Sequence, residues 1–135
     1  MMKEKMEKMG LKFTTYTSKS YNELSFYLMG AVMQIVEDKE NIILIIDSET
    51  KETIAIQKED YEKMNMSQDR MEKMGFDLYV WGSEDYTEMA FQLMAIARGF
   101  KEVEEKVILV VDFETKEITS IFKSDWEKLF KEEIF

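Results

Sequence analysis

The hydrophobic residues of this chain follow strand-like and helix-like periods in the same order in each half. Short aromatic and β-branched runs at residues 13–16 and 78–81 predict two strands. Apolar residues then recur at helical spacing, which predicts a helix of about four turns in each half. Ser20 and Asp85 each stand three positions before a glutamate, a pattern typical of a capping box at a helix start.

The second part of each half predicts a hairpin and a closing helix. Residues 42–46 and 107–111 are unbroken apolar runs, as expected for strands covered on both faces. Polar turns lead from them to residues 53–57 and 118–122, which complete a β-hairpin in each half. Ser124 and Glu127 repeat the cap pattern before the last helix. Each half therefore has the expected order β-α-β-β-α.

The two halves also resemble each other residue by residue. Residues 6–65 align with residues 71–130 without a gap, and 25 of the 60 pairs are identical, which indicates a duplication. Residues 60–74 between them contain no Pro or Gly and predict a stiff helical connector. We therefore expect an α+β fold of two tandem pseudo-symmetric units, residues 1–65 and 66–135. Each unit is expected to be a three-stranded sheet with helices, and the two to pack as one compact body.

Composition narrows the setting of the protein. Of the 135 residues, 45% are hydrophobic and 34% charged, which suits a folded core with a charged surface. Cysteine is absent, so disulfides and thiolate metal sites are excluded and an intracellular setting is favoured. No segment reads as a signal peptide or a membrane span. We expect a cytoplasmic protein that does not enter a membrane.

The residues needed for common catalytic chemistry are missing. Histidine and cysteine are both absent, and no glycine-rich phosphate loop or nucleophile elbow occurs. The acidic turns after residues 46 and 111 contain Lys51 and Lys116 and lack the glycine of a calcium loop, so we interpret them as solvated turns. We expect no enzymatic activity and no catalytic, cofactor-binding or metal-binding residues.

The long helix of the first half is apolar almost all round. Phe26, Met29, Met33 and Val36 line the face opposite its core positions. In the second half this face begins with aligned apolar residues, Phe91 and Met94, and then becomes basic at Arg98 and Lys101. The shared part predicts a contact between the halves or with the connector. Met33 and Val36 remain as an apolar extension that either packs inside the protein or forms an exposed docking patch.

Charge also distinguishes the halves. The net charge is −10, made up of −3 over residues 1–65 and −7 over residues 66–135. Lys12, Lys19 and Ser20 correspond to Asp77, Glu84 and Asp85, which adjoin Glu88. These acids either form a solvated face that suits a helix start or dock on a basic surface. The candidate partner-binding residues are therefore Asp77, Glu84, Asp85, Glu88, Met33 and Val36.

These features favour a small acidic protein-binding module that regulates or inhibits a partner by occupying its surface. The partner is expected to be a protein with a basic surface, including one whose nucleic-acid groove the acids imitate, while direct nucleic-acid binding is disfavoured by the charge. One alternative is a small-ligand or nucleotide sensor that uses a cleft between the halves. Another is a structural subunit that assembles with itself. A monomer and a homodimer both stay open.

Overall fold

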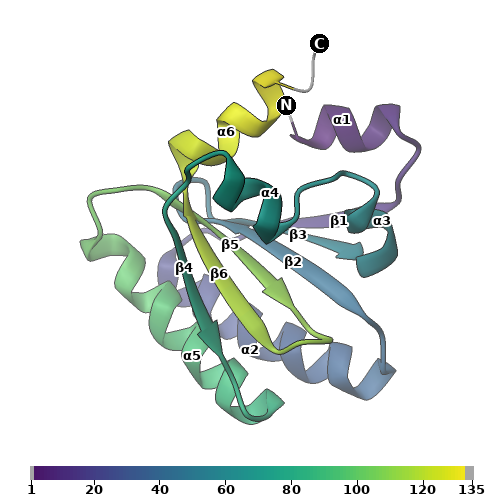
Figure 1. The fold of residues 1–135 in the computed structure, drawn as a ribbon. Helices are drawn as coiled ribbons and strands as arrows, with labels where there is room; N and C mark the ends of the chain where they lie inside the picture. Colours follow the sequence, from purple (N-terminus) through teal and green to yellow (C-terminus); the bar gives the residue numbers. More distant parts are fainter. Residues whose placement is uncertain (1, 133–135) are drawn as a thin grey trace.

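The computed structural model describes residues 2–132. Residue 1, where the first expected unit begins, and residues 133–135, where the second ends, lie outside the described part. Within that part the fold is α+β, with a six-stranded antiparallel sheet and six α-helices (Figure 1). The first half contains α1 (Met2–Lys8), β1 (Phe13–Thr17), α2 (Tyr21–Asp38), β2 (Ile42–Asp47), β3 (Glu52–Gln57) and α3 (Lys58–Glu62). The second half contains α4 (Gln68–Lys73), β4 (Leu78–Gly82), α5 (Tyr86–Gly99), a 3-10 turn η1 (Phe100–Glu102), β5 (Val107–Asp112), β6 (Glu117–Phe122) and α6 (Lys123–Glu132).

The sheet joins the two halves through their central strands. Its order is β1-β3-β2-β5-β6-β4, and β2 pairs with β5 in an antiparallel register centred on Ile45 opposite Val110. The three strands of each half, expected to form a sheet of their own, are instead one part of a continuous sheet. The strands β2 and β5 are apolar on both faces, so neither is suited to an exposed edge of a sheet. When they pair, the backbone hydrogen-bonding groups of each strand are satisfied by the other.

Helices cover both faces of this sheet. Helices α2 and α5 lie on one face, and α1, α3, α4 and α6 lie on the other (Figure 1). Alternate residues of β2 face the two layers, so Ile43 and Ile45 pack under the second group of helices while Leu44 and Ile46 pack under α2 and α5. The unbroken apolar runs are thus strands buried on both faces, as the sequence predicts.

The starts of the two long helices confirm the predicted caps at Ser20 and Asp85, whereas the carboxylates of Glu23 and Glu88 accept from the residue before each cap. The Ser20 hydroxyl accepts a hydrogen bond from the Glu23 amide at 3.1 Å, and the Asp85 carboxylate accepts one from the Glu88 amide at 2.8 Å. The cap expected at Ser124 is wrong, because α6 already begins at Lys123. There the chain passes from β6 into the helix without a loop, and the Lys123 amide donates to the Lys106 carbonyl at 2.9 Å.

The connector between the halves differs from the expected continuous helix. Helix α3 ends at Glu62 and α4 begins at Gln68, and between them Asn65 adopts a left-handed backbone with φ of 54°. The Ser67 hydroxyl accepts from the Arg70 amide at 3.2 Å and so caps α4. The break between α3 and α4 lets the side chains of Met64 and Met66 point into the core, where both are buried. Burial of two methionines therefore outweighs helix continuity.

Candidate functional site

Helices α2 and α5 pack side by side and run in opposite directions across one face of the sheet (Figure 1). Their inner positions are buried, including Leu28 and Leu93. The outer face of α2 is open, since Phe26 is 52% exposed and Met33 is 64% exposed. Phe91 of α5 is 63% exposed as well. The connector does not cover Phe26 and Phe91, because α3 and α4 lie on the opposite face of the sheet. The predicted contact between the halves is present, since α2 packs against α5 and the Phe26 ring contacts Arg98 of the second half.

Exposed apolar side chains of the two helices enclose a hollow of about 270 Å³, which we call the α2–α5 groove. It is formed by the C-terminal half of α2 and the N-terminal half of α5, and Thr87 is its one polar lining residue other than Tyr86. The Tyr86 hydroxyl donates to the Phe113 carbonyl at 2.7 Å, so its polar atom is already satisfied. The lining residues are Met29, Val32, Met33, Val36, Tyr86, Thr87, Ala90 and Phe91.

At the other end of the same helix pair, a cation lies over the aligned phenylalanine. The guanidinium of Arg98 lies over the ring of Phe26, with 5.6 Å between its central carbon and the ring centre. In the sequence alignment Phe26 corresponds to Phe91, and Arg98 corresponds to Met33. One end therefore has a charged side chain over its phenylalanine, whereas the other end has a methionine and an open groove.

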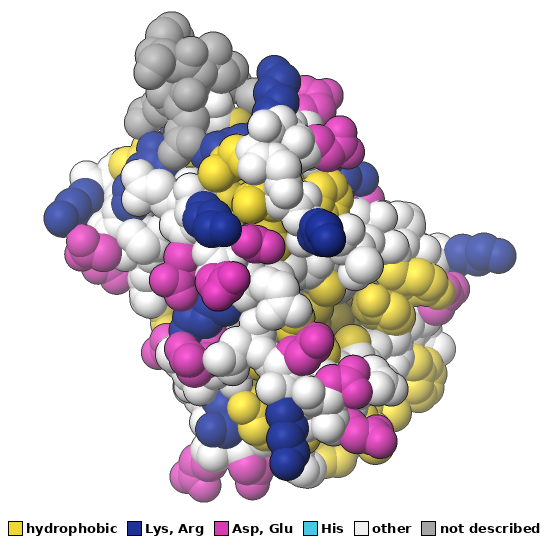
Figure 2. Space-filling model, turned by 90° about the vertical axis from the view of Figure 1, so that its right-hand side faces the viewer, with side chains coloured by type: hydrophobic (Ala, Val, Ile, Leu, Met, Phe, Trp, Pro, Cys, Tyr) yellow, Lys and Arg dark blue, Asp and Glu magenta, His cyan; other side chains and the backbone are white. Residues whose placement is uncertain are grey.

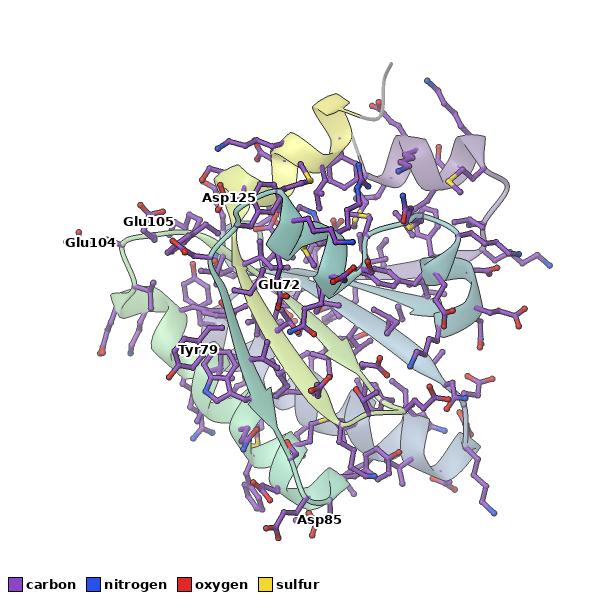
Figure 3. The ribbon with its side chains drawn as sticks, viewed as in Figure 1. Glu72, Tyr79, Asp85, Glu104, Glu105 and Asp125 are labelled. Carbon is purple, nitrogen blue, oxygen red and sulfur yellow. The ribbon has the colours of Figure 1, made fainter. Side chains whose placement is uncertain are left out.

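The structure brings together most, but not all, of the candidate residues named from the sequence. Met33 and Val36 line the groove, and Glu84 and Asp85 directly precede the groove residue Tyr86 at the start of α5. Asp77 lies apart from them, because it precedes β4 and the whole strand, about 16 Å of extended chain, separates it from Glu84. Figure 3 shows Asp85 at the lower end of the molecule in this view, where α5 begins.

The acidic residues at the start of α5 have a structural role. The Glu88 carboxylate accepts hydrogen bonds from the Glu84 amide at 3.1 Å and from the Gln92 side-chain amide at 3.2 Å. Together with the Asp85 cap, these contacts satisfy amides at the helix start, where negative charge is favourable. Helix stability is therefore a sufficient reason for Asp85 and Glu88.

At the neighbouring end of α2, Asp38 accepts hydrogen bonds from the Gln34 side-chain amide at 3.1 and 3.2 Å, but helix stability does not account for the other acids there. Glu37, Asp38 and Glu40 surround the C-cap residue Lys39, and no basic residue lies in the last turn of the helix. Negative charge at a helix C-terminus is unfavourable. Since this end of α2 adjoins the start of α5, the groove has acidic residues at one end. In Figure 2, exposed hydrophobic side chains at the height of α2 are bordered by acidic ones.

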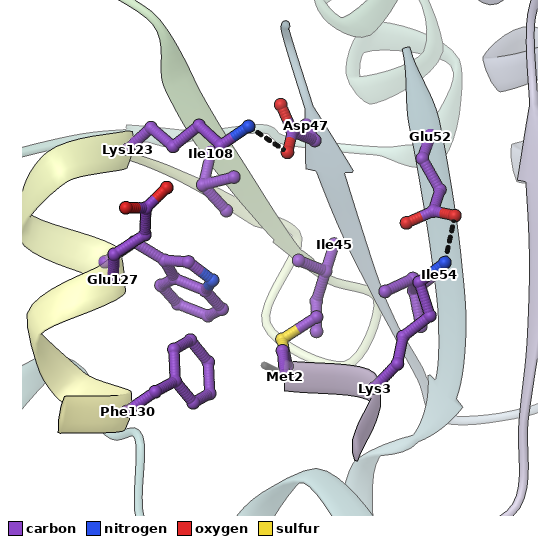
Figure 4. Close-up of a pocket in the computed structure, with 11 residues that line it drawn as sticks. Met2, Lys3, Ile45, Asp47, Glu52, Ile54, Ile108, Lys123, Glu127 and Phe130 are labelled. Carbon is purple, nitrogen blue, oxygen red and sulfur yellow. Dashed lines mark hydrogen bonds and ion pairs between the residues drawn. The ribbon is translucent and has the colours of Figure 1, made fainter. Parts of the chain in front are cut away.

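Two further hollows lie on the other face of the sheet, where lysines connect the halves. The Lys123 ammonium contacts the carboxylates of Asp47 at 2.8 Å and Glu49 at 2.7 Å, and the Lys58 ammonium contacts Asp112 at 3.0 Å and Glu114 (Figure 4 shows the Lys123 side). Burial lowers the pKa of Lys58, but hydrogen bonds to Glu114 and Asp112 raise it more, so the net pKa lies above its ordinary value.

The pairing of these lysines was missed in the sequence, where the acidic turns are interpreted as solvated. The available signal was that Lys58 and Lys123 are aligned and identical, as are Asp47 and Asp112. The pKa of Lys123 is raised in the same way as that of Lys58: burial opposes the shift, and hydrogen bonds to Asp47 and Glu49 outweigh it. The acidic turns therefore bind lysines across the boundary between the halves.

Other site types were sought over the described part of the chain. Residues 2–132 hold no group of three or more acidic, histidine or cysteine side chains placed to ligate a metal ion. Within the same range, no helix has both the length and the apolar character needed to cross a membrane. Comparisons with protein-family models, with curated proteins and with solved structures find no match to this chain.

Proposed function

We propose that this chain is a protein-binding module that docks through the α2–α5 groove. The supporting observation is the exposure of Met33 and Phe91 on the two walls of one apolar groove. Single exposed apolar side chains are ordinary on protein surfaces. A continuous apolar surface that is open to solvent, as in this groove, usually marks an interaction site. Methionine is unbranched and polarisable, so Met29 and Met33 can adapt to the shape of an inserted side chain.

The charges at the end of the groove favour a particular kind of partner. Glu37 and Glu40 follow the groove residue Val36 at the end of α2, and Glu84 and Asp85 precede the groove residue Tyr86 at the start of α5. A partner that inserts apolar side chains and places Lys or Arg beside them would satisfy both features. The module would then regulate or inhibit a cytoplasmic protein by occupying a basic surface, without catalysing a reaction. Imitation of a nucleic acid has less support, because Asp77 lies apart and Asp85 and Glu88 act as caps.

The proposal includes the origin of the groove. We infer that the halves are tandem pseudo-symmetric units, because the register of β2 and β5 is the same when the halves are exchanged. Ile43 is opposite Asp112, and Asp47 is opposite Ile108, each residue being aligned with the partner of the other pair. In that case Arg98 and Met33 occupy equivalent places, and the open groove is a specific departure of one end from the other.

This relationship provides a matched pair of variants for the test. The tagged chain is incubated with lysate of its native cells and the captured proteins are identified by mass spectrometry. Met33→Arg should remove a specifically captured protein, because it places an arginine beside Phe91 as Arg98 lies beside Phe26. Arg98→Met, which changes the other end of the helix pair, should leave capture intact. Equal capture by wild type and Met33→Arg would contradict a role for the groove.

The same variants distinguish a foreign partner from a second copy of the chain. Light scattering on the purified protein measures its mass in solution. A dimer that Met33→Arg converts to a monomer would support the self-assembling alternative and contradict the proposed foreign partner. A wild-type monomer that still captures a protein through the groove supports the binding module.

A further inference from the structure

Two hollows on the sheet face opposite the α2–α5 groove are built from aligned residues. The first pocket, of about 350 Å³, is lined by Asp47, Glu52, Lys123 and Trp126 among others. The second pocket, of about 340 Å³, is lined by the residues aligned with these: Asp112, Glu117, Lys58 and Tyr61. Both volumes fall within the range of small-ligand sites. Each pocket takes residues from both halves of the chain.

In the first pocket, one carboxylate of the lining is paired with a lysine of the protein itself. Lys3 of α1 extends into it, and its ammonium forms an ion pair with the Glu52 carboxylate (Figure 4). Asp47 is engaged by Lys123, so Glu52 is the carboxylate that receives Lys3. The chain therefore shows one ligand chemistry that this arrangement accepts, an ammonium group on a flexible alkyl chain.

The second pocket has the same carboxylates but lacks this lysine. The residue 65 positions after Lys3, at the same offset as the aligned pairs, is Gln68, which lines the pocket and cannot supply a charge. Asp112 is engaged by Lys58, as Asp47 is by Lys123. Glu117 is partly buried, and its carboxylate has no ion-pair or side-chain hydrogen-bond partner among the side chains that the structure describes. The position corresponding to the Lys3 ammonium is therefore unfilled.

The walls of the second pocket suit an alkyl chain. Ile43 and Val110 contribute sheet side chains, and the buried Met66 and Met71 contribute thioether side chains. Glu62 adds a second carboxylate to the lining, and within the described part of the chain it has no ion-pair partner either. With Lys58 neutralised by its own ion pairs, the remaining charge of the lining is negative. A ligand with a cationic head and an apolar body would match both parts of the surface.

We propose that the second pocket binds a primary alkylammonium group, with its ammonium on Glu117 and its methylene chain against Met66 and Met71. This site is separate from the α2–α5 groove and does not depend on the proposed docking there. The same chemistry is offered by a free diamine or polyamine and by a lysine side chain of a peptide. A chain of about four methylene groups, as in lysine, corresponds to the ligand that the first pocket receives.

Binding is tested by titrating the isotope-labelled full chain with n-pentylamine and following backbone amide signals by NMR at neutral pH. Saturable shifts are expected at Gln68, Met71 and Glu117, and n-pentanol, which has the same chain without the charge, should give none. Glu117→Gln should weaken binding by about tenfold or more, since a charge-assisted hydrogen bond is lost. Absence of saturable shifts, or equal shifts with Glu117→Gln, would overturn the proposal.

The aligned lysine supplies two further variants. Gln68→Lys should place an ammonium on Glu117, as Lys3 places one on Glu52, and abolish amine binding. Lys3→Gln should leave the Glu52 carboxylate without its ammonium and raise the number of amines bound from one to two. Circular dichroism of each variant checks that the fold is kept. Unchanged binding by Gln68→Lys would contradict the assignment, because the introduced ammonium would then not reach the site.

The source of the amine is distinguished in the same titration. Cadaverine represents a free diamine, and lysine with both backbone ends capped represents a side chain of a peptide. Tighter binding of cadaverine supports a free diamine, and tighter binding of the capped lysine supports a peptide. Failure of both, with n-pentylamine also unbound, overturns the site while leaving the α2–α5 groove untouched.

Discussion

The guanidinium of Arg98 lies 5.6 Å from the centre of the Phe26 ring, whereas the aligned Phe91 has Met33 in the corresponding place. An arginine over an aromatic ring is stabilising and reduces the exposed apolar surface. A methionine leaves the surface apolar. This difference, together with Val36 in place of the aligned Lys101, makes one end of the helix pair apolar and the other basic, and the proposed function depends on it.

The first prediction concerns the stability of the open end. Met33→Arg should raise the free energy of unfolding by about 0.5–1 kcal/mol, because the new guanidinium can lie over Phe91. Arg98→Met should lower it by a similar amount. Urea denaturation measures both changes, and binding of a hydrophobic fluorescent dye should fall in the first variant and rise in the second. A destabilised Met33→Arg protein would show that the two ends are not equivalent.

The second prediction concerns the lysines that connect the halves. Lys58 and Asp112 are largely buried, with side chains 19% and 22% exposed, so their pairing is less screened than a surface ion pair. Lys58→Met should cost about 1–2 kcal/mol, because it leaves two carboxylates without their cation. Lys123→Met should cost a similar amount. A double-mutant cycle with Asp112→Asn isolates the pair, and zero coupling would contradict the interpretation.

The third prediction is a loss of stability in alkali. In the folded state, burial lowers the pKa of Lys58 and of Lys123. Hydrogen bonds to carboxylates raise the pKa of both lysines by more, so the net shift is upward. Their stabilisation is therefore complete below the unfolded lysine pKa of about 10.4 and is lost as pH rises through the folded pKa. Burial also raises the pKa of the Tyr61 phenol, so its contribution falls in the same direction above about pH 10.

Urea denaturation between about pH 8 and about pH 11 measures this loss. The doubly substituted protein with Lys58→Met and Lys123→Met should show a shallower decline than wild type, and Tyr61→Phe should remove a further part of it. Parallel curves for all three proteins would show that these groups do not cause the alkaline loss.

The fourth prediction separates buried from exposed residues of α5. Leu93 is fully buried between the helices and the sheet, so Leu93→Ala should cost about 2–5 kcal/mol through lost contacts and a cavity. Phe91→Ala, two positions away on the exposed face, should change stability by about 0.5 kcal/mol or less. A large loss on removing Phe91 would mean that the groove serves the fold and not a partner.

Local parts of the fold could be read from the sequence because they depend on near neighbours. A cap needs only a hydroxyl or carboxylate that accepts a hydrogen bond from the backbone amide three positions later. Ser20 and Asp85 both form this bond as expected. The buried strand containing Ile45 was evident from its apolar run. The break at Asn65 was missed, because its cause is the burial of Met64 and Met66 by distant parts of the chain.

The relation between the halves depended on contacts that the pattern does not encode. An apolar strand such as β2 is compatible with a three-stranded or a six-stranded sheet, and the pairing of Ile45 with Val110 decides between them. Helical spacing placed Met33 on the outer face of α2, but whether another element covers it follows from the position of α3 and α4. Sequence reasoning thus placed Met33 and Val36 on the outer face and predicted the contact of Phe26 with the other half, but it did not predict where the connector lies.

The central claim, that the α2–α5 groove receives a partner protein, is tested most directly by site-specific photo-crosslinking in native cells. A photoreactive phenylalanine analogue replaces Met33 in the groove, and in separate proteins it replaces Arg98 at the other end or Lys128 of α6 on the other face. The expected result is one crosslinked protein from position 33, absent from position 128 and weak from position 98. Equal crosslinking from positions 33 and 128, or none from position 33, would contradict the claim.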